Sequence, residues 1–180
     1  ARGARSAPLR KLSTKKIRKM PHASARPVVA AAAPTSGAHI VWIRVGDLRV
    51  HDHPGLHAAS LLPSTTPIVP CFIFDPEEAS NTTPAFQRLV HEAVRELRAA
   101  LQERGADLVV RVGSPAEHIA RIAQETGASS LTCRKELEWS RIPSHRAAID
   151  AARAAGVTAV HEWSAPLREC EDDVESAENA

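Results

Sequence analysis

Residues 105–134 read GADLVVRVGSPAEHIARIAQETGASSLTCR, and this stretch decides the fold. It holds two short apolar runs, Leu108–Val112 and Ser130–Cys133, with a polar segment of helical character between them. Ser114, the proline after it and Glu117 predict a helix that opens with a capping box, in which Ser114 caps the backbone and Glu117 reaches back. Gly127 suits the C-terminal cap. A strand, a helix and a second strand in close succession predict a βαβ unit and a parallel sheet.

The same succession recurs along the chain. Apolar runs, most of them rich in β-branched residues, occupy Ile40–Ile43, Ile68–Phe74, Leu108–Val112, Ser130–Cys133 and Val157–Val160. Helices are predicted over Pro84–Arg104, from Ser114 to Gly127, and over Ser144–Ala155, and a glycine separates each from the next strand. Continuous apolar runs indicate strands that are buried on both faces. We therefore predict an α/β fold, a doubly wound, Rossmann-like, five-stranded parallel sheet with helices on both faces.

Charge is concentrated at the two ends of the chain. Residues 1–38 carry nine Lys or Arg and no acid, whereas the residues after Arg168 carry six acids and no base. The first segment is rich in Arg, Lys, Ser, Ala and Pro and has no apolar run long enough for a signal peptide or a membrane span, which is typical of an organelle transit peptide. We predict a disordered, removable basic segment over residues 1–37, a folded domain over 38–165 and an acidic tail or linker over 166–180.

A transit peptide places the protein in an organelle, with the chloroplast preferred to the mitochondrion, although the composition does not separate the two. The alternative is a disordered basic arm that contacts RNA, DNA or a membrane. The residues between the two charged ends are nearly balanced in charge. The folded core is therefore not expected to bind nucleic acid directly, and no membrane partner is expected.

Charged and aromatic residues follow the predicted strands. Because the carboxyl ends of parallel strands meet at one edge of a sheet, the segments after the strands should gather there. These segments are Arg44–His53, Asp75–Glu78, Gly113–Ser114, Arg134–Trp139 and Glu162–Trp163. An edge with this much charge predicts either a ligand crevice or a surface that receives another domain.

Other kinds of site are not indicated. The cluster His51, Asp52, His53 and His57 is interpreted as a turn that leads into a helix with Pro54 in its first position, not as a metal site. The three cysteines are widely spaced, which indicates neither a zinc site nor a disulfide framework. The nucleophile elbow and the common phosphate loops are absent from the sequence. No catalytic residue and no metal ligand is predicted.

Four segments carry a resemblance to a known family. They are Val41–Arg44 with Asp47–Arg49 and Asp52–Leu56, then Pro70–Pro76 (PCFIFDP), Asp107–Glu117, and Leu137-Glu138. In this order they resemble the N-terminal α/β domain of the photolyase/cryptochrome family, closest to a plant or algal branch. The resemblance covers roughly residues 39–163. The chain departs from the family pattern by one extra residue at Val45-Gly46 and by Leu137, where the family commonly has Tyr.

The resemblance implies an antenna-type domain without the photochemical part. In that family the flavin, the electron-transfer tryptophans and the DNA-lesion pocket belong to a helical domain, which residues 164–180 do not begin to supply. Bound FAD and an activity of its own are therefore not expected of this chain. The resemblance to a plant branch also implies an alternative arrangement, in which the α/β domain is joined to an α/β-hydrolase domain in place of the helical one.

Three functions stay open. The first is an α/β domain that binds a folate- or flavin-type antenna chromophore. The second is a pure protein-interaction module that docks onto a helical FAD-binding domain or a hydrolase domain. The third is a truncated part of a DNA photolyase, of a blue-light receptor, or of a fusion between a photolyase domain and a hydrolase.

The candidate site residues follow from the resemblance and from their place at the edge. Glu138 is the predicted acceptor for the donor edge of a pterin- or flavin-like ring, and Trp139 supplies a stacking face. The alternative for Glu138 is an exposed ion pair with Arg134, Lys135 or Arg141, which would contribute little. Arg44 or Arg49 would hold an anionic tail of the ligand. In the competing interpretation, the loop residues brace themselves or contact a partner domain; these are Arg44, Asp47, Arg49 and Asp52.

Overall fold

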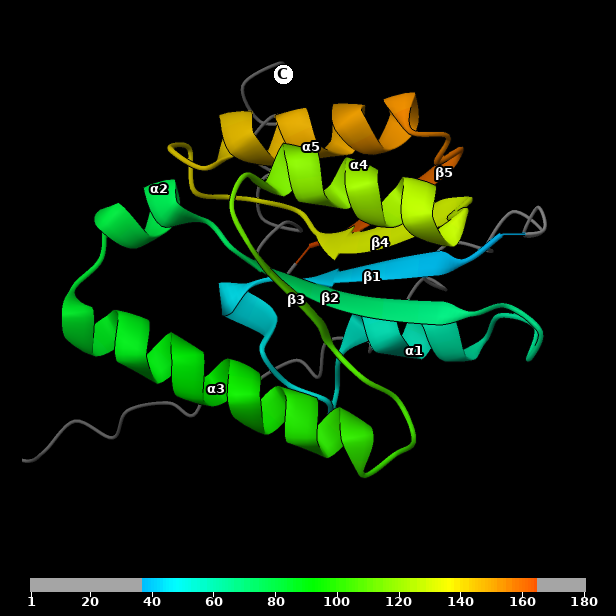
Figure 1. The fold of residues 1–180 in the computed structure, drawn as a ribbon, viewed down its shortest axis with the longest axis horizontal. Coiled ribbons are helices and arrows are strands. Elements are labelled where there is room, and N and C mark those ends of the chain that lie inside the picture. The colour runs from blue at the N-terminus through cyan, green and yellow to red at the C-terminus, as the bar shows by residue number, and fades with distance from the viewer. Residues whose placement is uncertain (1–36, 165–180) are drawn as a thin grey trace, which may run out of the picture. The chain divides into compact units, whose positions relative to one another are not determined.

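The computed structural model describes residues 37–164. Five strands form one parallel sheet in the order β3-β2-β1-β4-β5 (Figure 1). The strands are β1 (His39–Ile43), β2 (Ile68–Phe74), β3 (Val109–Val112), β4 (Ser130–Arg134) and β5 (Ala159–Trp163). The helices are the short η1 (Val45–Asp47), α1 (Pro54–Ser60), α2 (Pro76–Ser80), α3 (Pro84–Gln102), α4 (Pro115–Thr126) and α5 (Ile142–Ala154). The predicted α/β fold with five parallel strands is confirmed.

Helices cover both faces of the sheet (Figure 1). Because successive side chains of a strand point to opposite faces, β1 serves two hydrophobic clusters. Ile40 and Trp42 belong to the cluster on the side of α4 and α5. Val41 and Ile43 belong to the cluster on the side of α1 and α3. The central strand is therefore buried throughout, which explains its continuous apolar run.

The apolar residues of helix α3 recur at helical spacing in the sequence and pack against the sheet in the structure. Its buried residues Val90, Val94, Leu97 and Leu101 recur at helical spacing and form one stripe against the sheet. The Thr83 hydroxyl accepts the backbone N–H of Phe86 at 3.3 Å and caps the first turn.

Three local predictions need correction. Strand β5 begins at Ala159 and not at Val157, because the Val157 N–H still bonds back to the Ala152 carbonyl at 3.1 Å and so ends helix α5. Helix α5 begins at Ile142, two residues earlier than predicted. Helix α4 begins at Pro115, but the Ser114 side chain makes no capping hydrogen bond, so the predicted capping box is wrong. The fixed φ of the proline ring starts this helix without it.

The two charged ends of the chain lie outside the described residues. The predicted transit peptide over residues 1–37, the domain boundaries at 38 and 165, and the acidic tail therefore stay predictions. Between residues 37 and 164, no helix combines the length and the apolar content that a membrane span requires.

Candidate functional site at the carboxyl edge of the sheet

A crevice lies where the strand order reverses. The chain runs from β1 through β2 to β3 on one side and through β4 to β5 on the other, so the loops after β1 and β4 diverge. A hollow of about 670 Å³ opens there, lined by the segments after β1, β2 and β3 and by the start of α5. A polar hollow of about 290 Å³ adjoins it between the loops after β1 and β4. They share Arg44, Val45, Glu78, Glu138 and Arg141, and together we call them the edge crevice.

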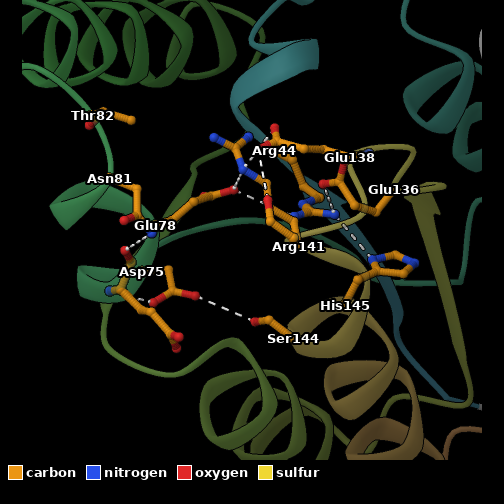
Figure 2. Close-up of polar contacts among 12 residues, drawn as sticks. Arg44, Asp75, Glu78, Asn81, Thr82, Glu136, Glu138, Arg141, Ser144 and His145 are labelled. Atoms are coloured by element: carbon orange, nitrogen blue, oxygen red, sulfur yellow. Dashed lines mark hydrogen bonds and ion pairs between the residues drawn. The ribbon is translucent and has the colours of Figure 1, made fainter.

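Arg44 is the first residue after β1 and is held from several sides (Figure 2). Its guanidinium lies 2.7 Å from Glu136 and 3.8 Å from Glu78. It also lies 3.2 Å from Nδ1 of His145 and 5.0 Å from the centre of the Trp42 ring. With 14% of its side chain exposed, Arg44 is a braced residue whose charge is already compensated.

Glu78 joins the loop after β2 to the start of α5. Its carboxylate lies 2.8 Å from Nε of Arg141, closer than it lies to Arg44. Burial raises the pKa of Glu78, and the neighbouring Arg141 and Arg44 oppose that rise. Arg141 and Arg44 therefore stabilise the charged form of Glu78, which burial disfavours.

Glu138 lines the edge crevice, and its carboxylate has partners of its own. Its Oε1 accepts the Ser140 hydroxyl at 2.9 Å, and its Oε2 lies 3.2 Å from Arg141. The side chain is 53% exposed, which leaves room for a further donor. Trp139, in contrast, is 83% exposed and lines none of the hollows described here.

Asp47 lies inside the protein, beneath the loop after β1. Its Oδ1 accepts the Arg44 backbone N–H at 2.7 Å, and its Oδ2 lies 3.3 Å from Nε2 of His53. Only 1% of Asp47 is exposed, so it offers no atoms to a partner domain in this conformation. Its contacts stabilise the loop that carries Arg44.

Arg49 and Asp52 are exposed and contact each other through the Arg49 side chain, whose Nε donates to the Asp52 carbonyl at 3.1 Å. Asp52 has a positive φ of 53°, a turn conformation that Asp tolerates. Neither residue lines the edge crevice. Of the residues predicted from the sequence, the crevice thus brings together Arg44 and Glu138 and leaves out Trp139, Arg49, Asp47 and Asp52.

Several crevice residues were not predicted as ligand-binding residues from the sequence. They are Glu78, Arg134, Lys135, Glu136 and Arg141. Glu78, Arg134, Lys135 and Glu136 lie in the segments that the sequence placed at this edge, whereas Arg141 lies beyond them, just before α5. Gly46, the extra residue of the loop, has a specific role: a Cβ there would lie 1.9 Å from Nη1 of Arg134. The missing side chain lets Arg134 lie against the loop after β1.

A third hollow, the apolar pocket, has about 280 Å³ and lies between the end of β2 and the start of α3. Phe72, Phe74, Val90 and His91 help to line it, and the rings of Phe74 and His91 stack with centroids 4.3 Å apart. It shares Val45, Phe72, Ile73, Asp75, Glu78 and Arg141 with the edge crevice. An apolar pocket therefore adjoins a charged one, an arrangement that suits a planar ring with polar substituents.

The sequence matches known proteins over the same region. The model of the family described as DNA photolyase matches residues 39–178. The blue-light photoreceptor PHR2 of Arabidopsis thaliana is 32% identical over 155 residues, covering 82% of this chain and 34% of that protein. A cryptochrome DASH of Natronomonas pharaonis is 32% identical over 146 residues, covering 74% of this chain and 29% of that protein.

Solved structures show the same fold. A cryptochrome from Synechocystis superposes with a TM-score of 0.63 at 24% identity, over 75% of this chain and 28% of that one. A photolyase from Sulfolobus tokodaii, solved with two FAD molecules that implied a novel light-harvesting cofactor for that protein, superposes with a TM-score of 0.60 at 19% identity, over 70% of this chain and 29% of that one. The chain spans about a third of the length of the curated relatives named above.

Proposed function

Because this chain belongs to the DNA photolyase family, we propose that its α/β domain binds a folate- or flavin-type antenna chromophore in the edge crevice. The main support is the larger hollow of about 670 Å³ at the strand-order reversal. Small-molecule sites occupy roughly 300–1,000 Å³ and occur at this position in parallel α/β sheets. The adjoining apolar pocket extends the space available to a ring system.

The charges of the crevice suit a ligand with an anionic tail. Arg44 and Arg141 each lie near two carboxylates. Arg134 and Lys135 line the same hollow and form no ion pair within residues 37–164. We therefore assign the tail to Arg134 and Lys135, in preference to the Arg44 or Arg49 suggested by the sequence.

Glu138 is assigned to the donor edge of the ring. A carboxylate accepts several hydrogen bonds, and Glu138 is exposed enough to keep Ser140 and Arg141 while it accepts from a ligand. Each charge-assisted hydrogen bond contributes roughly 1.5–3 kcal/mol. Trp139 would stack on the ring only after its exposed side chain turned toward the crevice.

The second candidate function is domain docking. Leu137 and Trp139 expose 44% and 83% of their surfaces on the loop after β4, and exposed apolar side chains of this size favour a protein contact. The partner would be a helical FAD-binding domain or a hydrolase domain, in the same polypeptide or in another. For the chain alone, we predict neither retention of FAD nor repair of pyrimidine dimers under blue light.

A ligand titration separates the two functions. The chain is titrated with a methenyl-folate, FMN and a deazaflavin, and binding is followed by absorbance and thermal shift. Three variants are compared with the wild type: Glu138→Ala, the double variant Arg134→Ala with Lys135→Ala, and the control Glu96→Ala. Glu96 is an exposed glutamate on α3, outside the crevice.

We expect one of the three ligands to bind, Glu138→Ala to weaken binding at least about tenfold, and Glu96→Ala to leave it unchanged. The double variant should bind the ligands that carry an anionic tail more weakly and bind a tail-free deazaflavin as tightly as the wild type does. No binding by the wild type at micromolar protein would favour docking. Undiminished binding by Glu138→Ala would remove this residue from the site.

A further inference from the structure

Three side chains that bind metal ions in other proteins converge at the β4–β5 end of the sheet. Cys133 and Glu162 are neighbours across the parallel strands β4 and β5, so their side chains lie on the same face. Helix α5 covers that face and places Nε2 of His145 2.6 Å from Oε1 of Glu162. One ligand atom from each of the three residues lies within 4.8 Å of the others.

Packing holds this cluster in place. The register of the sheet puts Cys71, Trp42, Cys133 and Glu162 in one row across β2, β1, β4 and β5. The Trp42 ring stacks on the imidazole of His145 with centroids 5.5 Å apart and planes inclined by 15°. Cys133 and His145 are buried, whereas the Glu162 side chain is 36% exposed. The cluster therefore has a fixed inner part and one ligand that reaches solvent.

We propose that Cys133, His145 and Glu162 form a binding site for a borderline divalent cation such as Zn²⁺. Thiolate sulfur, imidazole nitrogen and carboxylate oxygen are the donor atoms that zinc takes, whereas Mg²⁺ and Ca²⁺ prefer oxygen alone. Three protein ligands leave the fourth position of a tetrahedral ion for water on the exposed side of Glu162. Their positions, 133, 145 and 162, match no metal-binding sequence signature, so the site emerges only from the fold.

The geometry requires a modest rearrangement. Zinc bonds of about 2.0–2.3 Å place tetrahedral ligand atoms roughly 3.3–3.6 Å apart. Nε2 of His145 and Oε1 of Glu162 must therefore move apart from 2.6 Å, whereas the Cys133 sulfur lies within 4.8 Å of both. Glu162 supplies most of this movement, because it is partly exposed and lies on an edge strand.

Binding also changes the partner of Arg44. Arginine is always a donor, so its contact of 3.2 Å makes Nδ1 of His145 an acceptor and leaves the ring hydrogen on Nε2. A metal ion at Nε2 moves that hydrogen to Nδ1, and Arg44 then turns to Glu136, which is already 2.7 Å away. The Cys133 thiol releases its proton to solvent as the sulfur–metal bond forms.

Cobalt(II) tests the site, because a cobalt–thiolate bond adds a near-ultraviolet absorption band that cobalt bound to nitrogen and oxygen alone lacks. The chelator-treated full chain is titrated with CoCl₂, and ZnCl₂ is then added as a competitor. The same titration is done with Cys133→Ser, Glu162→Gln and the control Cys71→Ser. Cys71 is the matched control, since it is a buried thiol in the same row on the other side of Trp42.

We expect a sulfur band that zinc abolishes, in the wild type and in Cys71→Ser. The band should be lost in Cys133→Ser, and Glu162→Gln should bind at least about tenfold more weakly. Glu162→Gln changes a partly exposed side chain, so circular dichroism should show an intact fold. The proposal is overturned by a wild type without the band, by a band that persists in Cys133→Ser, or by unchanged affinity in Glu162→Gln. Cobalt binding without the band would also overturn it, since exposed histidines such as His51 and His57 explain such binding.

Discussion

Two buried polar residues decide how the loop after β1 is held. Asp47 and His53 are 1% and 3% exposed, and the Asp47 carboxylate accepts the backbone N–H of Arg44. Charged residues are rarely buried this completely unless they are paired. From the sequence, the charged residues after β1 form one group. In the structure Asp47 is buried, Arg44 lines the edge crevice and Arg49 is exposed to solvent.

The first prediction concerns Asp47. Asp47→Ala removes the charge-assisted hydrogen bond to Arg44 and leaves buried polar groups without their partner. We expect the free energy of unfolding to fall by about 3 kcal/mol, measured by urea denaturation. Asp52→Asn is the matched control, because Asp52 is exposed on the same loop, contacts Arg49 through its backbone carbonyl, and Asn tolerates the positive φ of 53° as Asp does. Equal losses in the two variants would contradict the structural role of Asp47.

The second prediction concerns His39, at the start of β1. Burial, with a smaller contribution from the nearby His161, lowers the pKa of His39 from 6.5 to about 4. Between these values the unfolded chain takes up a proton that the folded chain does not. Stability should therefore fall as the pH drops from about 6.5 to about 4, by up to about 3 kcal/mol.

The slope of the free energy of unfolding against pH, compared between variants, checks this prediction. Urea denaturation across that pH range should show a flatter pH dependence for His39→Gln than for the wild type, whatever the absolute stability of the variant. His51→Gln, which changes an exposed histidine, serves as the control. A slope that His39→Gln leaves unchanged would assign the acid sensitivity to other groups.

At the scale of the elements, the sequence predicted the positions of the strands and of α3 better than the residues at which helices and strands begin and end. The β-branched runs and the stripe of α3 located the strands and this helix because burial on one or both faces leaves a direct trace in the sequence. The capping box at Ser114 and the start of β5 failed because a helix end has several ways to satisfy its backbone groups. Composition does not distinguish between them.

The third prediction tests one such helix end, the C-terminal cap of α4. Gly127 ends α4 with a φ of +60°, and the Ala128 N–H bonds back to the Ala123 carbonyl at 2.9 Å. No atom lies within 4 Å of a Cβ placed at Gly127, so the cost of a side chain is conformational only. Gly127→Ala should lower the free energy of unfolding by about 1 kcal/mol, and Gly127→Asn by less. A loss in Gly127→Asn that equals or exceeds the loss in Gly127→Ala would contradict the left-handed cap.

At the scale of the whole molecule, the parallel topology places the edge crevice, and ion pairs between its loops determine which charges it offers. The rule that ligands lie at the carboxyl edge needs only the strand order, so the sequence predicted where to look. It could not predict that Glu136, 92 positions along the chain from Arg44, compensates that arginine, or that Arg134 lies over Gly46. Such pairs form only when the two loops meet. For this reason the proposed chromophore site places the anionic tail at Arg134 and Lys135, and not at Arg44.

The most direct test of the chromophore proposal is the change in amide chemical shifts when ligand is added to the isotope-labelled chain. This measurement also detects weak binding, and it maps the ligand onto the fold. With a methenyl-folate or FMN, we predict shifts concentrated in residues 44–46, 75–78, 114–116 and 134–141, the segments that line the edge crevice. Shifts confined to another face, such as the exposed side of α1, or no shifts with any of these ligands at millimolar concentration, would contradict an antenna site in this domain.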